Sequence, residues 1–274
     1  MSTSNRAKAH GIQPRKSLGQ NFLVDEHVTR RIVDAADVQP GDLVIEIGPG
    51  LGALTRLLAD RAGQVIAIEL DQTIIPALQQ ELGDRSNVQI LHADALEVDY
   101  LTLTAGRPVR IVANLPYYIT SHAIRVLLES GIDWRCIVLT VQLEVAQRIA
   151  AKPPHMSTLA VSVQYYGDPE LLFRVPPGAF YPPPSIDSAT LRITRRESPQ
   201  NSVAVLPDPA LFFQWVKAGF SQPRKQIRNN LYTNLGISRV ETEDILAKVG
   251  ISPERRAETL TMDEWHALVA ASIA

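Results

Sequence analysis

One stretch decides the fold of this chain: Leu43-Val-Ile-Glu46-Ile-Gly48-Pro-Gly50-Leu-Gly52. Its strand-like part, residues 42–48, is short, apolar and ended by glycine, which is typical of a buried parallel strand. Helical periodicity follows from Leu51 to Ala59. Glycines between a strand and a helix permit a tight turn, and the helix N-terminus offers free N–H groups to a ligand. The stretch therefore predicts the first turn of an open α/β sheet, where such sheets bind a nucleotide.

Strand-like and helix-like segments alternate after this turn. We expect strands at residues 64–70, 87–92, 110–114 and 134–141, with helices at 73–82, 121–129 and 144–151. Alternation at this spacing indicates a doubly wound, Rossmann-like α/β sheet. Two more strand-like runs, 171–175 and 189–194, flank a proline-rich loop at 176–184 and predict an antiparallel addition at the sheet edge.

The C-terminal part of the chain has a different pattern. Residues 195–209 are polar and contain prolines, which is typical of a linker. Short helices are expected beyond it at 210–220, 225–235, 241–249 and 262–273. We therefore predict a Rossmann-like domain with a basic N-terminal segment at residues 1–198 and a small all-helical domain at 199–274.

Composition favours a soluble globular protein. The chain has 274 residues, 45% of them hydrophobic, and no apolar run approaches the roughly 20 residues of a membrane span. The N-terminus is polar and basic, unlike a secretory signal. The single cysteine, Cys136, lies in an apolar run and is expected to be a buried thiol, which excludes internal disulfides and cysteine-based metal clusters. We expect a cytoplasmic protein without a metal.

Charge is distributed unevenly along the chain. The formal net charge is only −2, yet residues 1–24 carry four basic residues and no acid, and residues 209–240 carry five and no acid. Two interpretations stay open: solvated helix faces, or two surfaces that contact phosphates.

The glycine-rich turn fits two cofactors. Gly48-x-Gly50-x-x-Ala53 satisfies the dinucleotide pattern, and Glu69, 19 residues after Gly50, is placed to accept hydrogen bonds from ribose hydroxyls. Two features favour S-adenosylmethionine over NAD: the spacing Glu46-x-Gly-x-Gly-x-Gly, and Asp94 at the end of the third strand, where an acid can accept from the adenine amine. The alternatives are a helix cap for Asp94 and surface charges for Glu69 and Asp71.

Asn114-Leu115-Pro116-Tyr117 ends the expected fourth strand. The side-chain oxygen of Asn114 and the carbonyl of Leu115 can accept the two hydrogens of the amine on a planar amino-bearing base. Pro116 has a fixed φ and can set the turn that aims this carbonyl, and Tyr117 can stack on the base. We therefore expect these four residues to be catalytic, chiefly by positioning the amine. A strand that simply runs into a Pro-Tyr turn is the alternative.

Together with other segments, these motifs resemble the ribosomal RNA adenine dimethyltransferases, most closely the bacterial enzymes of the small subunit. The matching segments are Lys16-Ser-Leu-Gly-Gln-Asn-Phe-Leu23, Ile45–Gly52, Ile68–Asp71, Asp94-Ala95, Asn114–Ile119, Gln142–Val145, Pro177–Pro184, Asp187–Ala189, Arg224-Lys225, Arg228-Asn229 and Arg256–Glu258. The resemblance implies S-adenosylmethionine as cofactor and a cofactor site lined by Asn21, Leu23, Gly48, Glu69, Asp94 and Asn114; Gly50 is added by its place in the turn.

The resemblance also implies the substrate. It would be a pair of adjacent adenosines in a hairpin loop near the 3′ end of 16S rRNA, within an assembling small subunit. We expect the basic segments to contact this RNA through Arg15, Lys16, Lys217, Arg224, Lys225 and Arg228, and the protein to be a monomer. Leu143 and Pro223 depart from the basic residues common in the family, which bears on RNA contacts rather than on methyl transfer.

Three other functions stay open. A large-subunit adenine methyltransferase of the antibiotic-resistance type is disfavoured by the pI of about 6.3 and by the loop Phe180-Tyr-Pro-Pro-Pro184. A non-catalytic assembly factor is disfavoured by the intact Asn-Leu-Pro-Tyr and cofactor acids. An NAD oxidoreductase would be distinguished by thermal stabilisation of the protein with NAD instead of S-adenosylmethionine. His92 and His122 are expected to be structural rather than catalytic bases.

Overall fold

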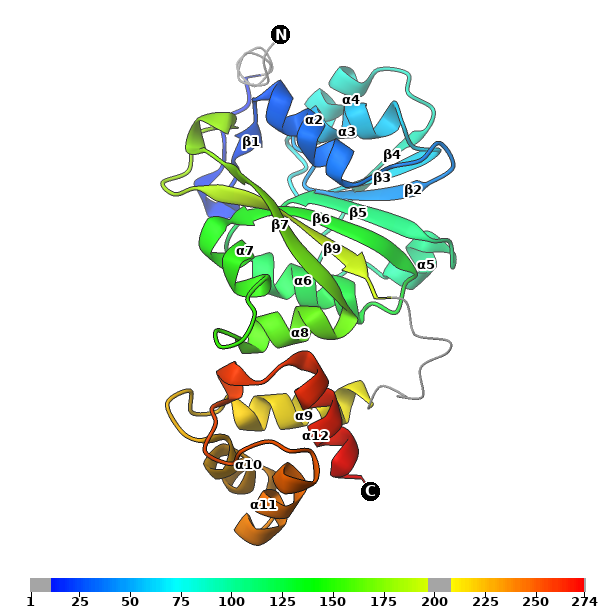
Figure 1. Cartoon of the computed structure of the whole chain (residues 1–274). Coiled ribbons are helices and arrows are strands. Elements are labelled where there is room, and N and C mark those ends of the chain that lie inside the picture. The colour runs from blue at the N-terminus through cyan, green and yellow to red at the C-terminus, as the bar shows by residue number, and fades with distance from the viewer. Residues whose placement is uncertain (1–10, 197–207, 274) are drawn as a thin grey trace. The chain divides into compact units, whose positions relative to one another are not determined.

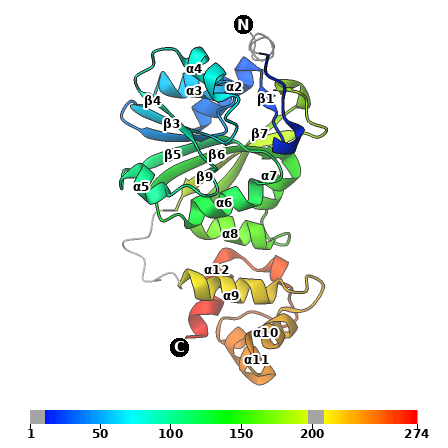
Figure 2. The same cartoon turned by 180° about the vertical axis from the view of Figure 1, so that it is seen from behind.

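The computed structural model describes residues 11–196 and 208–273 (Figures 1 and 2). The strands are β1 (Phe22–Leu23), β2 (Leu43–Ile47), β3 (Gln64–Glu69), β4 (Val88–His92), β5 (Val109–Asn114), β6 (Trp134–Gln142), β7 (Gly167–Val175), β8 (Phe180–Tyr181) and β9 (Ser188–Arg195). The α-helices are α2 (Glu26–Ala35), α3 (Ala53–Ala59), α4 (Ile75–Leu82), α5 (Tyr100–Thr104), α6 (Thr120–Glu129), α7 (Leu143–Ile149), α8 (Thr158–Tyr166), α9 (Pro209–Gly219), α10 (Ile227–Leu235), α11 (Arg239–Lys248) and α12 (Met262–Ala271).

A seven-stranded sheet in the order β4-β3-β2-β5-β6-β9-β7 forms the centre of the first part of the chain. The strands β2 to β6 are parallel, and every residue of β2 is buried, as expected of a strand covered on both faces. β9 runs antiparallel to β6, with Val138 opposite Arg192. The predicted α/β class and the antiparallel addition are confirmed.

The strand order reverses between β2 and β5. Because parallel crossovers are right-handed, this reversal places α3 and α4 on one face of the sheet and α5 and α6 on the other. Figures 1 and 2 show this arrangement, with α2 beside α3. Loops that leave β2 and β5 in opposite directions open a crevice at the carboxyl ends of the strands, which is where sheets of this type bind ligands.

A segment before the sheet crosses the edge of this crevice. We call residues 11–25 the N-terminal strap. Its strand β1 pairs antiparallel with β8, with Phe22 opposite Tyr181. The strap ends at Asp25, whose carboxylate accepts the N–H groups of His27 and Val28 and so caps α2.

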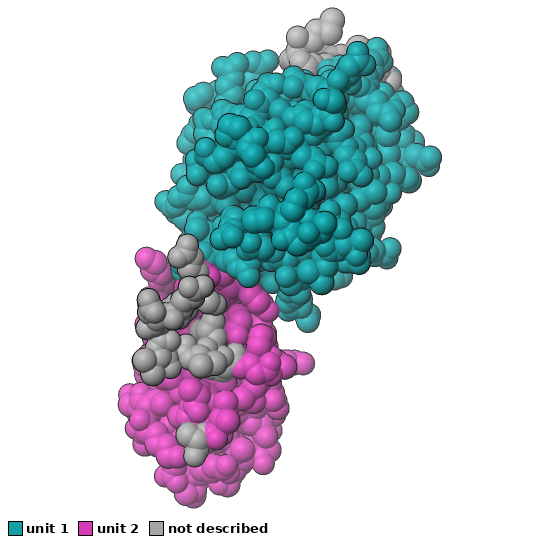
Figure 3. All heavy atoms as spheres, turned by 90° about the vertical axis from the view of Figure 1, so that its right-hand side faces the viewer, with its two compact units in different colours: residues 1–146, 168–195 teal, residues 147–167, 196–274 magenta. Residues whose placement is uncertain are grey.

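The chain divides into two compact units, coloured in Figure 3. The first contains residues 1–146 and 168–195, and the second contains 147–167 and 196–274. The second unit is helical and has its own core, in which the ring of Tyr165 on α8 lies 4.6 Å from that of Phe212 on α9. The predicted boundary at 198/199 lies outside the described residues.

Candidate active site

A cavity lies at the carboxyl ends of β2, β3, β4 and β5, and its empty space of about 830 Å³ includes open solvent at the mouth. Four strand ends and the N-terminal strap supply its walls. The lining residues are Leu18 to Phe22, Ile47, Gly48, Gly50, Ile68 to Leu70, Ile74, Ala93 to Ala95, Asn114 to Ile119, and Phe180.

The loop after β2 needs its glycines. Gly48 and Gly50 have φ angles of 71° and 53°, a left-handed conformation that favours glycine. A Cβ at Gly50 would also lie 2.8 Å from Cδ1 of Phe22 in the strap. The backbone of this loop therefore lies directly against the cavity and against Phe22 of the strap, with no room for a side chain at Gly50.

Glu69 is buried at the end of β3, with 6% of its surface exposed. Its Oε2 accepts the N–H of Gly50 at 3.2 Å and its Oε1 accepts the N–H of Asp71 at 2.8 Å. Burial raises the pKa of this carboxyl, and the two backbone donors counter part of the rise. The alternative of a surface charge at Glu69 is excluded, because the side chain lies in the cavity wall.

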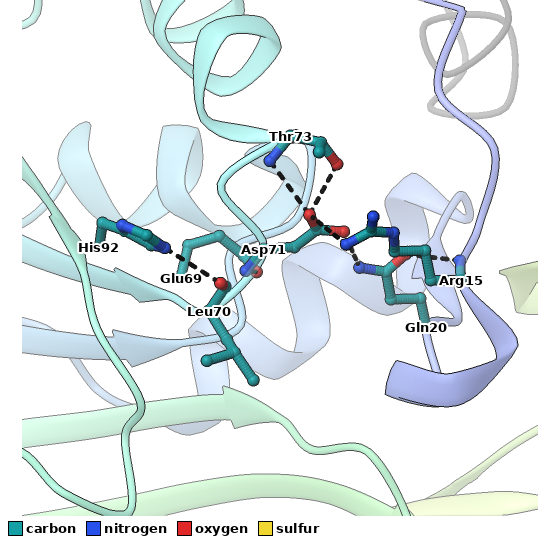
Figure 4. Close-up of polar contacts among 7 residues, drawn as sticks. All are labelled: Arg15, Gln20, Glu69, Leu70, Asp71, Thr73 and His92. Atoms are coloured by element: carbon teal, nitrogen blue, oxygen red, sulfur yellow. Dashed lines mark hydrogen bonds and ion pairs between the residues drawn. The ribbon is translucent and has the colours of Figure 1, made fainter.

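Asp71 is also buried, and it joins the strap to the end of β3 (Figure 4). Its carboxylate accepts from Nε2 of Gln20 at 2.8 Å and from Nη1 of Arg15 at 3.3 Å, as well as from the N–H and hydroxyl of Thr73. Burial alone would raise the pKa of Asp71, but these hydrogen bonds outweigh it and lower the pKa. Asp71 is therefore not a surface charge either.

Other predicted cofactor residues line two different cavities. Asn21, Gly48 and Asp94 line the cavity, and Oδ1 of Asp94 also accepts the N–H of Leu96 at 2.9 Å, so this acid caps a local turn while facing the cavity. Leu23 is buried and lies behind the glycine loop in a smaller cavity of about 290 Å³.

Asn114 is held by the strap. Its Nδ2 donates to the carbonyl oxygen of Asn21 at 2.9 Å. Since a carbonyl can only accept, this contact fixes which side of the amide carries the nitrogen. Oδ1 then accepts no hydrogen bond from any described residue.

The next residues continue the wall. Leu115 is 2% exposed and its N–H donates to Thr140. The carbonyl of Pro116 accepts hydrogen bonds from the Ile119 N–H and the Thr120 hydroxyl, in the turn that leads into α6. The hydroxyl of Tyr117 lies 2.8 Å from the Ser188 hydroxyl, which holds its ring at the wall; burial raises its pKa.

Comparison with known proteins agrees with this geometry. The family model described as Ribosomal RNA adenine dimethylase matches residues 11–272. The chain belongs to the ribosomal RNA adenine dimethylase family. It is 43% identical to the Ribosomal RNA small subunit methyltransferase A of Pelotomaculum thermopropionicum, covering 95% of this chain and 92% of the relative. The protein of the same name in Moorella thermoacetica is 46% identical, covering 94% and 92%.

Solved structures have the same fold. The 23S rRNA methyltransferase ErmE superposes with a TM-score of 0.75 at 28% identity, covering 93% of this chain and all of that one. A dimethyladenosine transferase from Plasmodium falciparum superposes with a TM-score of 0.76 at 24% identity, covering 90% and 95%. As a ribosomal RNA adenine dimethylase, this chain is an S-adenosylmethionine-dependent methyltransferase.

The cavity suits that cofactor. Glu69 and Asp94 offer carboxylate oxygens to hydroxyl and amine donors, and the Gly48–Gly50 backbone leaves room for close approach. Glu46, 1% exposed in the wall of the smaller cavity, has two carboxylate oxygens that accept no hydrogen bond from a described residue. Burial raises the pKa of this carboxyl to about 8, so near neutral pH it holds a proton and can donate or accept a hydrogen bond.

The basic residues predicted to contact RNA have different surroundings in this dimethylase-family chain. Lys217, Arg224 and Lys225 are exposed and make no ion pair within the described parts of the chain. Arg228 is half-buried and pairs with Glu243 at 3.2 Å. Arg15 pairs with the buried Asp71, and 54% of its side chain stays exposed. Lys16 belongs to the 3-10 turn Lys16–Leu18, and its side chain lies outside the description.

Several lining residues were missed by sequence reasoning. Phe22, Ile74 and Phe180 lack a pattern that separates them from core residues. Gln20 and Tyr118 lie inside the segments Lys16–Leu23 and Asn114–Ile119 but are not among the predicted site residues. The one sequence signal for Tyr118 is a second aromatic residue directly after Tyr117; its side chain is 62% exposed at the cavity wall. His92 hydrogen-bonds the Leu70 carbonyl, as expected for a structural residue.

Residues 11–196 and 208–273 gather no cluster of three His, Cys, Asp or Glu side chains able to hold a metal ion. Within the same residues, no helix combines the length and hydrophobicity needed to cross a membrane.

Proposed function

We propose that this chain dimethylates the exocyclic amines of two adjacent adenosines in the 3′-terminal hairpin loop of 16S rRNA, in the small ribosomal subunit. The observation that supports this substrate is the identity of 43–46% to relatives named for the small subunit, over 94–95% of the chain. The match to ErmE, a 23S rRNA methyltransferase, is 28% identical. We place the activity in the cytoplasm, as a step of small-subunit biogenesis.

Asn114 and Leu115 would orient the amine. Oδ1 of Asn114 is available because its Nδ2 donates to Asn21, and Leu115, the next residue in the chain, also lines the cavity. Two acceptors can bind the two amine hydrogens and so direct the nitrogen lone pair away from them. When bound, S-adenosylmethionine supplies a methyl group activated by its positive sulfur. Catalysis is then mostly positioning, and the proton leaves to solvent after transfer.

The target base must leave its stack to reach this wall. Tyr117 is placed to stack on it, since the bond to Ser188 holds the ring at the cavity. A stacked base contributes roughly 1–3 kcal/mol. The second methylation removes one amine hydrogen, so the pocket must accept a nitrogen held by a single acceptor.

The exposed Lys217, Arg224 and Lys225 would contact rRNA phosphates, because no described acid neutralises them. Arg15, Lys16 and Arg228 would also contact phosphates, and Arg15 and Arg228 already pair with acids within the chain. We also propose that the protein acts as a monomer.

The decisive experiment offers labelled S-adenosylmethionine with undermethylated small subunits, large subunits or protein-free rRNA. We expect four methyl groups per small subunit, two on each adenosine, and little transfer to the other substrates. Asn114→Ala should lose at least 100-fold in single-turnover rate while it still binds cofactor, by analogy with the loss of one preorganised donor, about 10²–10³-fold. Transfer to large subunits alone would replace this proposal with the large-subunit function, and an unchanged Asn114→Ala rate would exclude the orienting role.

A further inference from the structure

The N-terminal strap is joined to the sheet through one buried carboxylate. The Asp71 side chain is 1% exposed and accepts four hydrogen bonds (Figure 4). Two come from Thr73 in its own turn, at 3.0 Å and 2.6 Å. The other two come from the strap, from Gln20 and Arg15, which are 51 and 56 residues away in sequence.

Gln20 is held on both sides of its amide. Its Oε1 accepts the backbone N–H of Arg15 at 2.8 Å, and its Nε2 donates to Oδ2 of Asp71 at 2.8 Å. An N–H can only donate and an ionised carboxylate can only accept, so this orientation of Gln20 is the one that satisfies both neighbours. Arg15 and Gln20 thus form a closed turn docked on Asp71.

The residue after Gln20 contacts the proposed catalytic amide. The Asn21 carbonyl accepts Nδ2 of Asn114 at 2.9 Å, and Asn21 donates to the Gly19 carbonyl at 3.1 Å. A shift of Gln20 therefore moves the carbonyl that orients Asn114. The pairing of β1 with β8 restrains the strap on the other side of Asn21.

We propose that Asp71 is a positioning residue for methyl transfer: by docking Gln20 and Arg15, it holds the Asn21 carbonyl where it turns Oδ1 of Asn114 toward the substrate amine. This inference rests on the proposed function. Asp71 does not touch the reacting atoms in this arrangement. It acts through the strap, and its contacts with Thr73 belong to the turn before α4.

The contacts permit an exchange of partners that tests the link. In Asp71→Asn, an oxygen placed toward Thr73 and Arg15 keeps those bonds and turns an NH2 group toward the Nε2 of Gln20, so two donors meet. In Gln20→Glu, two carboxylates meet. Combining both changes restores a donor on residue 71 opposite an acceptor on residue 20, while the Arg15 N–H keeps its acceptor. Thr73→Val is the matched control, because it removes a bond to Asp71 without touching the strap.

Three quantities should be measured on the full-length chain: the single-turnover rate on small subunits, the S-adenosylmethionine Kd by calorimetry, and amide hydrogen exchange of residues 15–23. We expect each single variant to lose about 10- to 100-fold in rate, the range for a misplaced reacting group. Exchange in the strap should rise, and the Kd should change less than the rate. The double variant should recover most of the rate and the protection, and Thr73→Val should stay within about twofold of the unmodified chain.

Unchanged rates in both single variants would overturn the inference. So would single variants that lose activity without recovery in the double variant, since that outcome describes a merely structural acid. The exchange and Kd measurements need no ribosomal substrate. If the unmodified chain fails to methylate small subunits, the proposed function fails, and the docking of the strap is still decided by the exchange data.

Discussion

Glu46 and Glu69 lie on adjacent strands, and burial raises the pKa of both carboxyl groups. They differ in how their oxygens are satisfied. Glu69 accepts two backbone N–H groups, whereas neither oxygen of Glu46 has a partner among the described residues. Thr55 lies close enough to lower the pKa of Glu46, yet its hydroxyl is also unpaired. Ionising Glu46 therefore costs more free energy than ionising Glu69.

Glu46 should make folding depend on pH. Burial, reinforced by the charge of Glu69, raises its pKa from 4.5 to about 8. The folded chain then holds a proton that the unfolded chain releases, so stability is full below pH 4.5 and falls as pH rises toward 8. Glu46→Gln cannot ionise, so its free energy of unfolding in urea should rise relative to that of the unmodified chain as pH increases across this range. The expected difference is a few kcal/mol, at about 1.4 kcal/mol per pKa unit. A constant difference at every pH would contradict the buried, protonated Glu46.

Glu69→Ala should weaken S-adenosylmethionine binding. The change removes an acceptor from the cavity wall and leaves the N–H groups of Gly50 and Asp71 without their partner. We expect the Kd to rise at least 10-fold, since a hydrogen bond to a charged group contributes about 1.5–3 kcal/mol. Calorimetry measures it, with the exposed Asp84→Ala as control. Equal Kd values for the two variants would remove Glu69 from the cofactor site.

At the scale of elements, the strap and the glycine loop are fitted to each other. Phe22 of β1 occupies the space that a side chain at Gly50 would need, and Asn21 orients the residue that ends β5. The site therefore depends on a short strand that pairs with β8, far away in sequence. Two-residue strands contribute little stability alone, so side-chain contacts such as those of Asp71 must hold the strap.

Gly50→Ala should disturb this fit. The new Cβ would lie 2.8 Å from the Phe22 ring, in a backbone with φ of 53°. We expect a loss of about 1–3 kcal/mol in unfolding free energy, as for overpacked sites. Phe22→Leu should be less harmful in the Gly50→Ala background than alone, because it relieves the clash; a double-mutant cycle in urea measures this coupling. Gly41→Ala, which meets nothing within 4 Å, is the control. Strictly additive effects would show that the two residues do not collide.

For the whole molecule, a net charge of −2 conceals where positive charge is available. Arg228 and Arg239 share Glu243, so two of the five basic residues at 209–240 are partly neutralised. Lys217, Arg224 and Lys225 remain exposed, without an ion pair in the described structure. Binding to a prefolded ribosomal subunit would rely on such free cations, because each phosphate contact releases counterions.

Neutralising Lys217, Arg224 and Lys225 together to glutamine should weaken small-subunit binding and flatten its salt dependence. The expected slope change is about 0.7–0.9 per lost phosphate contact. Affinity measured from 50 to 200 mM salt tests this, with cofactor Kd expected to be unchanged. Arg125→Gln with Arg135→Gln is the control, because both arginines already pair with acids. An identical salt slope in the triple variant would make these residues a solvated helix face.

Local patterns determined the strands, the glycine loop and the Asn-Leu-Pro-Tyr turn, because burial period, left-handed glycines and strand-end polar residues act over a few neighbouring positions. Tertiary structure alone decided the rest. The bonds of Asp71 to Gln20 and Arg15, of Asn114 to Asn21, and of Arg228 to Glu243 join residues 15 to 93 positions apart. Tertiary structure also decided that residues 147–167 belong to the same compact unit as the C-terminal helices. Such contacts carry no local signal, because they form only after packing of the sheet and helices brings distant side chains within reach.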